Sequence, residues 1–116
     1  MILEDEFLKP DWDGYGADPV LPVTMENAER FINAIPEGVM KPEIGADPSG
    51  DVSLDWCHNK HWVFSVSIDS NNNLAYAALF DGVGCHGTGK FVDGIIPEVI
   101  ITMIKRIQDK TENKDG

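Results

Sequence analysis

The stretch DVSLDWCHNKHWVFSVSIDSNNNLAYAALF, residues 51–80, decides the fold. Within it, residues 51–57, 62–69 and 74–80 each alternate large apolar side chains with small or polar ones. A period of two in runs rich in β-branched and aromatic residues is typical of half-buried strands in an antiparallel sheet. The links between the runs are short, so the three strands are predicted to follow one another as hairpins.

The segments on either side of this stretch predict two helices. Residues 23–35 repeat apolar side chains at helical spacing, with Thr24 as a candidate N-cap and Pro36 as a stop. Residues 96–109 form the second helix, with Pro97 suited to its first turn. Its wide apolar stripe is predicted to contain Ile96, Val99, Ile100, Met103, Ile104 and Ile107.

Two further segments are expected at the edges of the sheet. Residues 41–47 contain Pro42 and are followed by Pro48, which suits a short edge strand. The glycine-rich segment 81–94 is expected to be an edge strand or a loop. Its expected inward-facing residues are Val83, Cys85 and Phe91. The predicted fold class is α+β, with a mainly antiparallel meander of four or five strands and both helices packed on one face.

The length of 116 residues predicts a single domain. Residues 1–10 are interpreted as a short helix or an arm on the core, and residues 111–116 as a disordered polar tail. The chain starts without a basic segment followed by an apolar run, and no apolar run approaches the roughly 20 residues that span a bilayer. We therefore expect a cytoplasmic protein without a membrane partner. Two cysteines do not make a disulfide framework.

The negative charge is concentrated in one part of the chain. Residues 1–81 hold 15 acidic and 4 basic side chains, whereas residues 82–116 hold 5 of each, so the whole net charge of −11 comes from the first segment. Such a surface repels nucleic acid and anionic membranes. It attracts a basic protein surface, although acidic residues also serve solubility alone.

Two groups of residues are candidates for contacting a partner. The loop at 11–22 combines turn-forming residues with large aromatic ones, so it either makes contacts or plugs one end of the core. Serines and aspartates on the polar side of the predicted strands form a face that is either solvated or a contact surface. The candidates are Trp12, Asp13, Tyr15 and Asp18 in the loop, and Ser53, Asp55, Ser65, Ser67 and Asp69 on the face.

Cysteine and histidine side chains raise the question of a metal site. A Cys-His-x-x-His set and a second Cys-His pair contain the ligand types of tetrahedral zinc. Adjacent side chains on a strand point apart, however, and no paired C-x2-C spacing is present. We therefore expect no metal and no cofactor. The candidate ligands are Cys57, His58, His61, Cys85 and His86.

The glycine-rich segment does not make a nucleotide site. Gly84 and the pair Gly89-Lys90 have the spacing of a phosphate-binding loop, but Phe91 stands where the magnesium-binding hydroxyl is required. The next helix is also expected to start near Pro97 and not at the lysine. Nucleotide binding is therefore not predicted.

Several segments resemble a group of small bacterial proteins. The shared features are a WDGYGA-P segment, here residues 12–17 with Pro19, then a helix, a P-x-I element at 42–44 and a strand ending in Leu-x-Trp at 54–56. The resemblance covers about the first two-thirds of the chain. It implies no activity and brings no functional residue, and the cysteines and histidines are not part of the pattern. It implies one structural unit formed by Trp12, Tyr15 and Trp56.

These observations predict a non-enzymatic, acidic, protein-binding domain of bacterial or phage origin. A sharper version of the hypothesis is an inhibitor that mimics nucleic acid and blocks a nucleic-acid-binding protein. One alternative is a small enzyme that uses Cys85, His86 or the aspartates, and a concave pocket with convergent polar groups would favour it. Another is a homodimer or larger homo-oligomer formed by pairing of the edge strand that begins at Val83.

Overall fold

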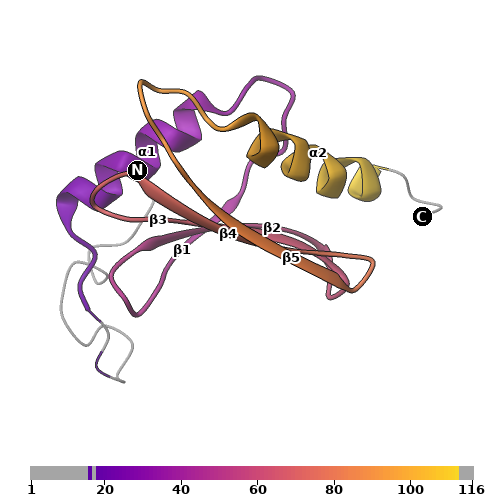
Figure 1. Cartoon of the computed structure of the whole chain (residues 1–116), viewed down its shortest axis with the longest axis horizontal. Coiled ribbons are helices and arrows are strands. Elements are labelled where there is room, and N and C mark those ends of the chain that lie inside the picture. Colours follow the sequence, from indigo (N-terminus) through magenta and orange to yellow (C-terminus); the bar gives the residue numbers. More distant parts are fainter. Residues whose placement is uncertain (1–15, 17, 113–116) are drawn as a thin grey trace.

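Five antiparallel strands form one sheet in the order β1-β2-β3-β4-β5, and both helices lie on the same face of it (Figure 1). The computed structural model describes Gly16 and residues 18–112. In chain order the elements are α1 (Pro22–Ala34), β1 (Glu43–Ala46), β2 (Val52–Asn59), β3 (Trp62–Ile68), β4 (Asn73–Phe80), β5 (Val83–Lys90) and α2 (Glu98–Glu112). The predicted α+β meander is thereby confirmed.

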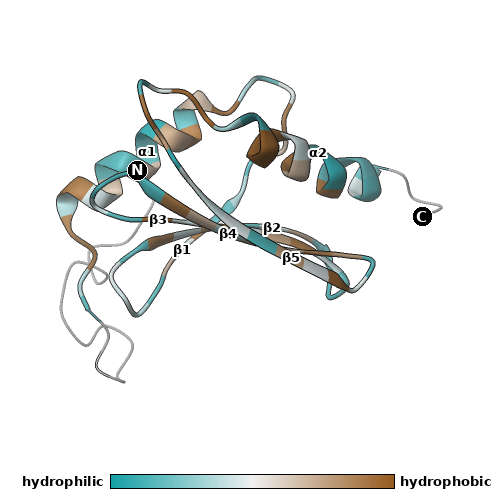
Figure 2. Cartoon of the chain, viewed as in Figure 1, coloured by the Kyte–Doolittle hydropathy of each residue, from teal (hydrophilic) through white to brown (hydrophobic). Residues whose placement is uncertain are grey.

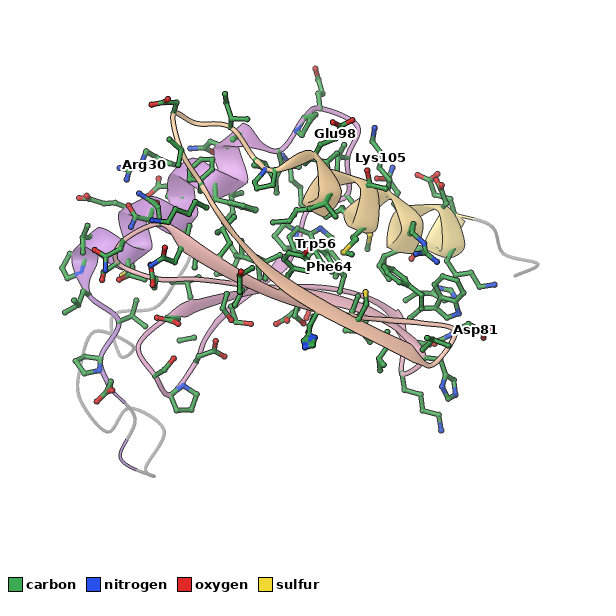
Figure 3. All side chains as sticks on the ribbon, in the orientation of Figure 1. Arg30, Trp56, Phe64, Asp81, Glu98 and Lys105 are labelled. Atoms are coloured by element: carbon green, nitrogen blue, oxygen red, sulfur yellow. The ribbon has the colours of Figure 1, made fainter. Side chains whose placement is uncertain are left out.

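The core lies between the sheet and the two helices. Alternate residues of β2 and β3 are fully buried, among them Trp56 and Phe64, whose ring centroids are 5.5 Å apart. Both labelled side chains lie between the sheet and α2 in Figure 3. Apolar and polar segments alternate along the helices (Figure 2), so each helix presents an apolar side to the sheet. From α2 the fully buried residues are Ile100, Ile104 and Ile107.

The start of α1 differs from the prediction. The helix begins at Pro22, Leu21 is its N-cap, and no side chain caps it. Thr24, the predicted cap, is a buried residue inside the helix. The cap lies earlier because proline at the first helical position needs no amide partner and has a helical φ already. The helix ends before Ile35, whose extended backbone precedes Pro36.

The end of α2 also differs from the prediction. The helix starts at Glu98, directly after Pro97, whose carbonyl oxygen accepts a hydrogen bond from the Ile100 amide at 3.0 Å. It continues to Glu112, so the first part of the expected polar tail is helical. The Thr111 hydroxyl donates to the Ile107 carbonyl oxygen at 2.9 Å, a bond that a helix accommodates in its last turn. The expected arm at 1–10 lies outside the described residues.

Three residues that were expected to face inward are exposed. Val99, Val83 and Cys85 lie at the surface, with 46% and 72% of the two valines accessible. The helices pack mainly against β2 and β3, and α2 reaches β4. The inner side of β5 therefore has no helix above it. Phe91 is buried as predicted, with its ring 5.3 Å from that of Phe31.

The glycine-rich segment forms a strand and not a loop. The turn before it, Asp81-Gly82, has positive φ at both positions, which suits a two-residue hairpin. Tyr76 of β4 folds its ring across the facing Gly87, where a Cβ atom would overlap the tyrosine hydroxyl. Glycine is thus required at this point of β5 because an aromatic ring occupies the space of its side chain.

Candidate interaction surface

The sheet face that points away from the helices is the candidate site. We call it the outer face, and it consists of the alternate side chains of each strand that point away from the helices. Among the described residues no helix packs on it, and side chains project from it into solvent (Figure 3). Its members are every second residue from Ser53 to Cys57 on β2, from Val63 to Ser67 on β3, from Ala75 to Leu79 on β4 and from Gly84 to Lys90 on β5, together with Glu43 and Gly45 on β1.

The strand register gives the outer face a charge gradient. One cross-strand row passes from Glu43 on β1 through Asp55, Ser65 and Ala77 to His86 on β5. Directly opposed residues on antiparallel strands point to the same face and interact. The β1–β2 side of the face is therefore acidic, its middle is uncharged, and its β5 edge carries imidazole and ammonium groups.

Serine hydroxyls hold the carboxylate at the centre of the acidic side. Ser65 on β3 donates to Asp55 Oδ1 at 2.6 Å, and Ser53 on β2 donates to the same carboxylate at 3.2 and 3.3 Å. Hydrogen bonds to an ionised acceptor are short and strong. The carboxylate is thus oriented by two strands, and its remaining lone pairs face outward. Sequence reasoning selected all three residues as candidates, and the structure brings them together.

A second group of carboxylates lies where β1 turns into β2. Ser67 donates to Asp47 Oδ2 at 2.9 Å, and the Asp47 amide donates to the Asp51 carbonyl oxygen at 2.8 Å. Burial raises the pKa of the Asp51 carboxyl, and the nearby charges of Asp69 and Asp47 raise it further. The carboxylates of Asp47, Asp51 and Asp69 therefore interact with one another at this end of the outer face.

Asp69 has a structural role in the turn between β3 and β4. Its carboxylate accepts hydrogen bonds from the backbone amides of Asn71 at 2.8 Å and Asn73 at 2.9 Å, and from the Asn73 side chain at 3.0 Å. Burial alone would raise the pKa of Asp69, but these hydrogen bonds and Lys90 lower it. This candidate therefore holds the turn and borders the face, and does not lie in the middle of it.

The remaining predicted contact residues lie elsewhere. Asp18 is exposed, and its amide donates to the Pro48 carbonyl oxygen at 2.8 Å, next to the acidic turn. The loop candidates Trp12, Asp13 and Tyr15 fall outside the described residues. The structural unit proposed for the aromatic residues is described only at Trp56, whose indole nitrogen donates to the Met40 carbonyl oxygen at 2.8 Å.

A shallow hollow of about 580 Å³ lies on the outer face beside β5. Its lining is mostly apolar and includes Val63, Ala77 and Leu79. Cys85 and His86 also line it, although Cys85 lies on the strand side that faces the helices, opposite buried Ala78. Thus the cysteine and histidine that an enzyme would use do not converge, because they are adjacent on a strand and point apart.

The candidate metal ligands are also dispersed. Cys57 and Cys85 are both exposed, and they point to opposite faces of the sheet from strands that β3 and β4 separate. His58 lies where the register of β2 shifts, and His61 lies in the following turn. Within the residues described, no group of three or more histidine, cysteine or carboxylate side chains is placed to hold a metal ion.

Sequence reasoning missed three members of the acidic side. Glu43, Asp47 and Asp51 were assigned to an edge strand and turns, without a role in the candidate face. Glu43 lies beside the central aspartate because it pairs with Asp55, whereas Asp47 and Asp51 are joined in the turn that closes the β1–β2 hairpin. A prediction that residues 41–47 pair with the following strand as a hairpin would have placed these residues beside the candidate face.

Comparison with family models, curated proteins and solved structures finds no match. The helices of the described part of the chain are too short or too polar to cross a membrane.

Proposed function

We propose that this chain is a small binding domain whose acidic outer face docks on a basic surface of a partner protein. The observation that carries the proposal is the sequence of the three strands that build this side, because β1, β2 and β3 contain no lysine or arginine. Their outward carboxylates therefore have no cation beside them on the same strands.

The preorganisation of the carboxylates supports the same reading. Asp55 and Asp47 are both oriented by serine hydroxyls of β3. A binding group that is already ordered loses less conformational entropy when a partner arrives. Charged patches of this kind also steer encounters with an oppositely charged surface, and the effect weakens as salt screens it. A sharper form of the proposal is mimicry of nucleic acid by this carboxylate array.

The test is titration of the isotope-labelled protein with an oligolysine peptide, followed by NMR. We expect chemical-shift changes along β1, β2 and β3, and weaker binding as salt is raised. Replacing Glu43→Gln together with Asp55→Asn should weaken binding about fivefold, since one exposed and one half-buried charge contribute about 1 kcal/mol in total. The asparagine still accepts the serine hydroxyls, so the face keeps its shape.

The matched control removes two exposed acidic groups from the helices instead. Glu26→Gln together with Glu98→Gln changes the net charge by the same amount, since both side chains are exposed on the opposite side of the sheet. We expect this control to change the affinity much less. Equal losses for the two pairs, or shifts spread over the helices, would show attraction to the net charge alone and would refute the proposal.

A further inference from the structure

The two edges of the sheet differ in how well they are protected. β1 is four residues long and lies between Pro42 and Pro48, so little backbone is available there. β5 is eight residues long, contains no proline or bulge, and no described strand pairs with its free side. Long unprotected edges readily accept another strand, and proteins normally block them.

The backbone groups on the free side of β5 can be assigned from the ladder. The Phe91 amide donates to the Asn72 carbonyl oxygen at 2.9 Å, so this residue points its backbone groups toward β4. Backbone groups alternate in direction along an antiparallel strand. Gly84, His86, Thr88 and Lys90 therefore point their amide and carbonyl groups away from β4, toward solvent.

We propose that β5 pairs antiparallel with β5 of a second copy of this chain, across a two-fold axis at Gly87. In this register Gly84 lies opposite Lys90 and His86 lies opposite Thr88, so every outward amide and carbonyl group of the strand finds a partner. A strand that is complementary to itself in this way forms an isologous interface. The two five-stranded sheets become one continuous sheet.

The side chains of β5 fit this arrangement. Val83, at 72%, is the most exposed of the large apolar residues that the structure describes, and the register places it beside Phe91 of the second copy. This is a pair without mutual hydrogen bonds, in which side chains approach most closely. The strand also has three glycines in its interior, so few bulky side chains lie beside the second strand.

The net charge of −11 does not prevent a second copy from pairing at this edge. β5 has no carboxylate, and its basic side chains are His86 and Lys90. With strands about 4.8 Å apart, the acidic β2 strands of the two copies would be about 34 Å apart. That distance is several times the Debye length of about 8 Å at physiological salt, so repulsion is largely screened.

The experiment is sedimentation equilibrium of the full chain over about a hundredfold range of concentration, at low and high salt. We expect a shift from 12.8 kDa toward twice that mass, and a tighter dimer at high salt because screening weakens repulsion. Thr88→Pro should weaken the dimer at least about tenfold, because it removes an outward amide from each copy. Thr88→Val keeps that amide and should leave the dimer intact.

A measurement on the unchanged protein guards against a variant that fails to fold. Hydrogen exchange followed by NMR should show the amides of Gly84, His86, Thr88 and Lys90 protected at high concentration and exchanging freely on dilution. A monomer at all concentrations with these four amides unprotected would overturn the proposal and leave the edge for a strand of another protein. Protection that does not change with dilution would also overturn it, because the edge would then be covered within one copy.

Discussion

Replacing Gly87→Ala tests the contact between β4 and β5 most directly. A Cβ atom at this position would overlap the hydroxyl and ring of Tyr76, which lies across the glycine. The tyrosine ring must then shift, which disturbs its contact with Phe64, whose ring centroid is 6.0 Å from its own. We expect a less stable protein, although alanine is otherwise the better residue in a strand.

The size of the effect follows from three contributions. The displaced ring loses an aromatic pair worth about 1 kcal/mol, and exposing roughly 60 Å² of its surface costs about 1.5 kcal/mol. Replacing glycine by alanine returns about 0.5–1 kcal/mol of conformational entropy. The free energy of unfolding should therefore fall by about 1.5–2 kcal/mol. With a urea dependence near 2 kcal/mol/M, the midpoint should fall by about 0.8–1 M.

Urea unfolding followed by tryptophan fluorescence measures this change, because buried Trp56 reports on the core. The decisive comparison is a double-mutant cycle with Tyr76→Ala, in which the alanine at position 87 should stabilise and not destabilise. Gly84→Ala is the matched control on the same strand, since its Cβ would meet only ordinary contacts at 3.8 Å or more. An equal cost of Gly87→Ala with and without the tyrosine would refute the reasoning.

Two further predictions concern the contact of Gln108 with the loop at 38–40 and the ionisation of Asp51 and Asp69. Gln108→Ala should lower the free energy of unfolding by about 1–2 kcal/mol and speed hydrogen exchange of the Met40 amide, because Gln108 accepts from that amide and donates to the Gly38 carbonyl oxygen, each at 2.8 Å. Thermal unfolding measures the first effect and hydrogen exchange the second. An unchanged exchange rate at Met40 would contradict the prediction. Asp51→Asn should stabilise the protein near neutral pH, and this gain should vanish as the pH falls through the raised pKa of the folded state toward 3.8. Asp69→Asn should destabilise the protein above pH 3.8, and this loss should disappear as the pH falls through the lowered pKa of the folded state. Urea midpoints measured against pH test both variants, and stability changes of the same sign would contradict the assignment.

Local pattern was sufficient for much of the fold. The alternation along residues 51–80 depends only on neighbouring residues, and it correctly predicted three strands and the buried side of β2 and β3. The same alternation placed Ser53, Asp55 and Ser65 on one polar face, where the structure joins them by hydrogen bonds. Helical spacing likewise located both helices, although not their ends, since caps depend on single residues such as Pro22.

The sequence by itself determined the element types and the alternation of sides, because both arise from the chain's own periodicity. Only the tertiary structure decided which sides are covered. Val83 and Cys85 obey the strand pattern and still lie exposed, because the helices do not extend over β5. The acidic side of the outer face also forms only when the register brings Glu43 beside Asp55. Burial and charge clustering depend on what another segment places nearby, and a single strand does not encode that.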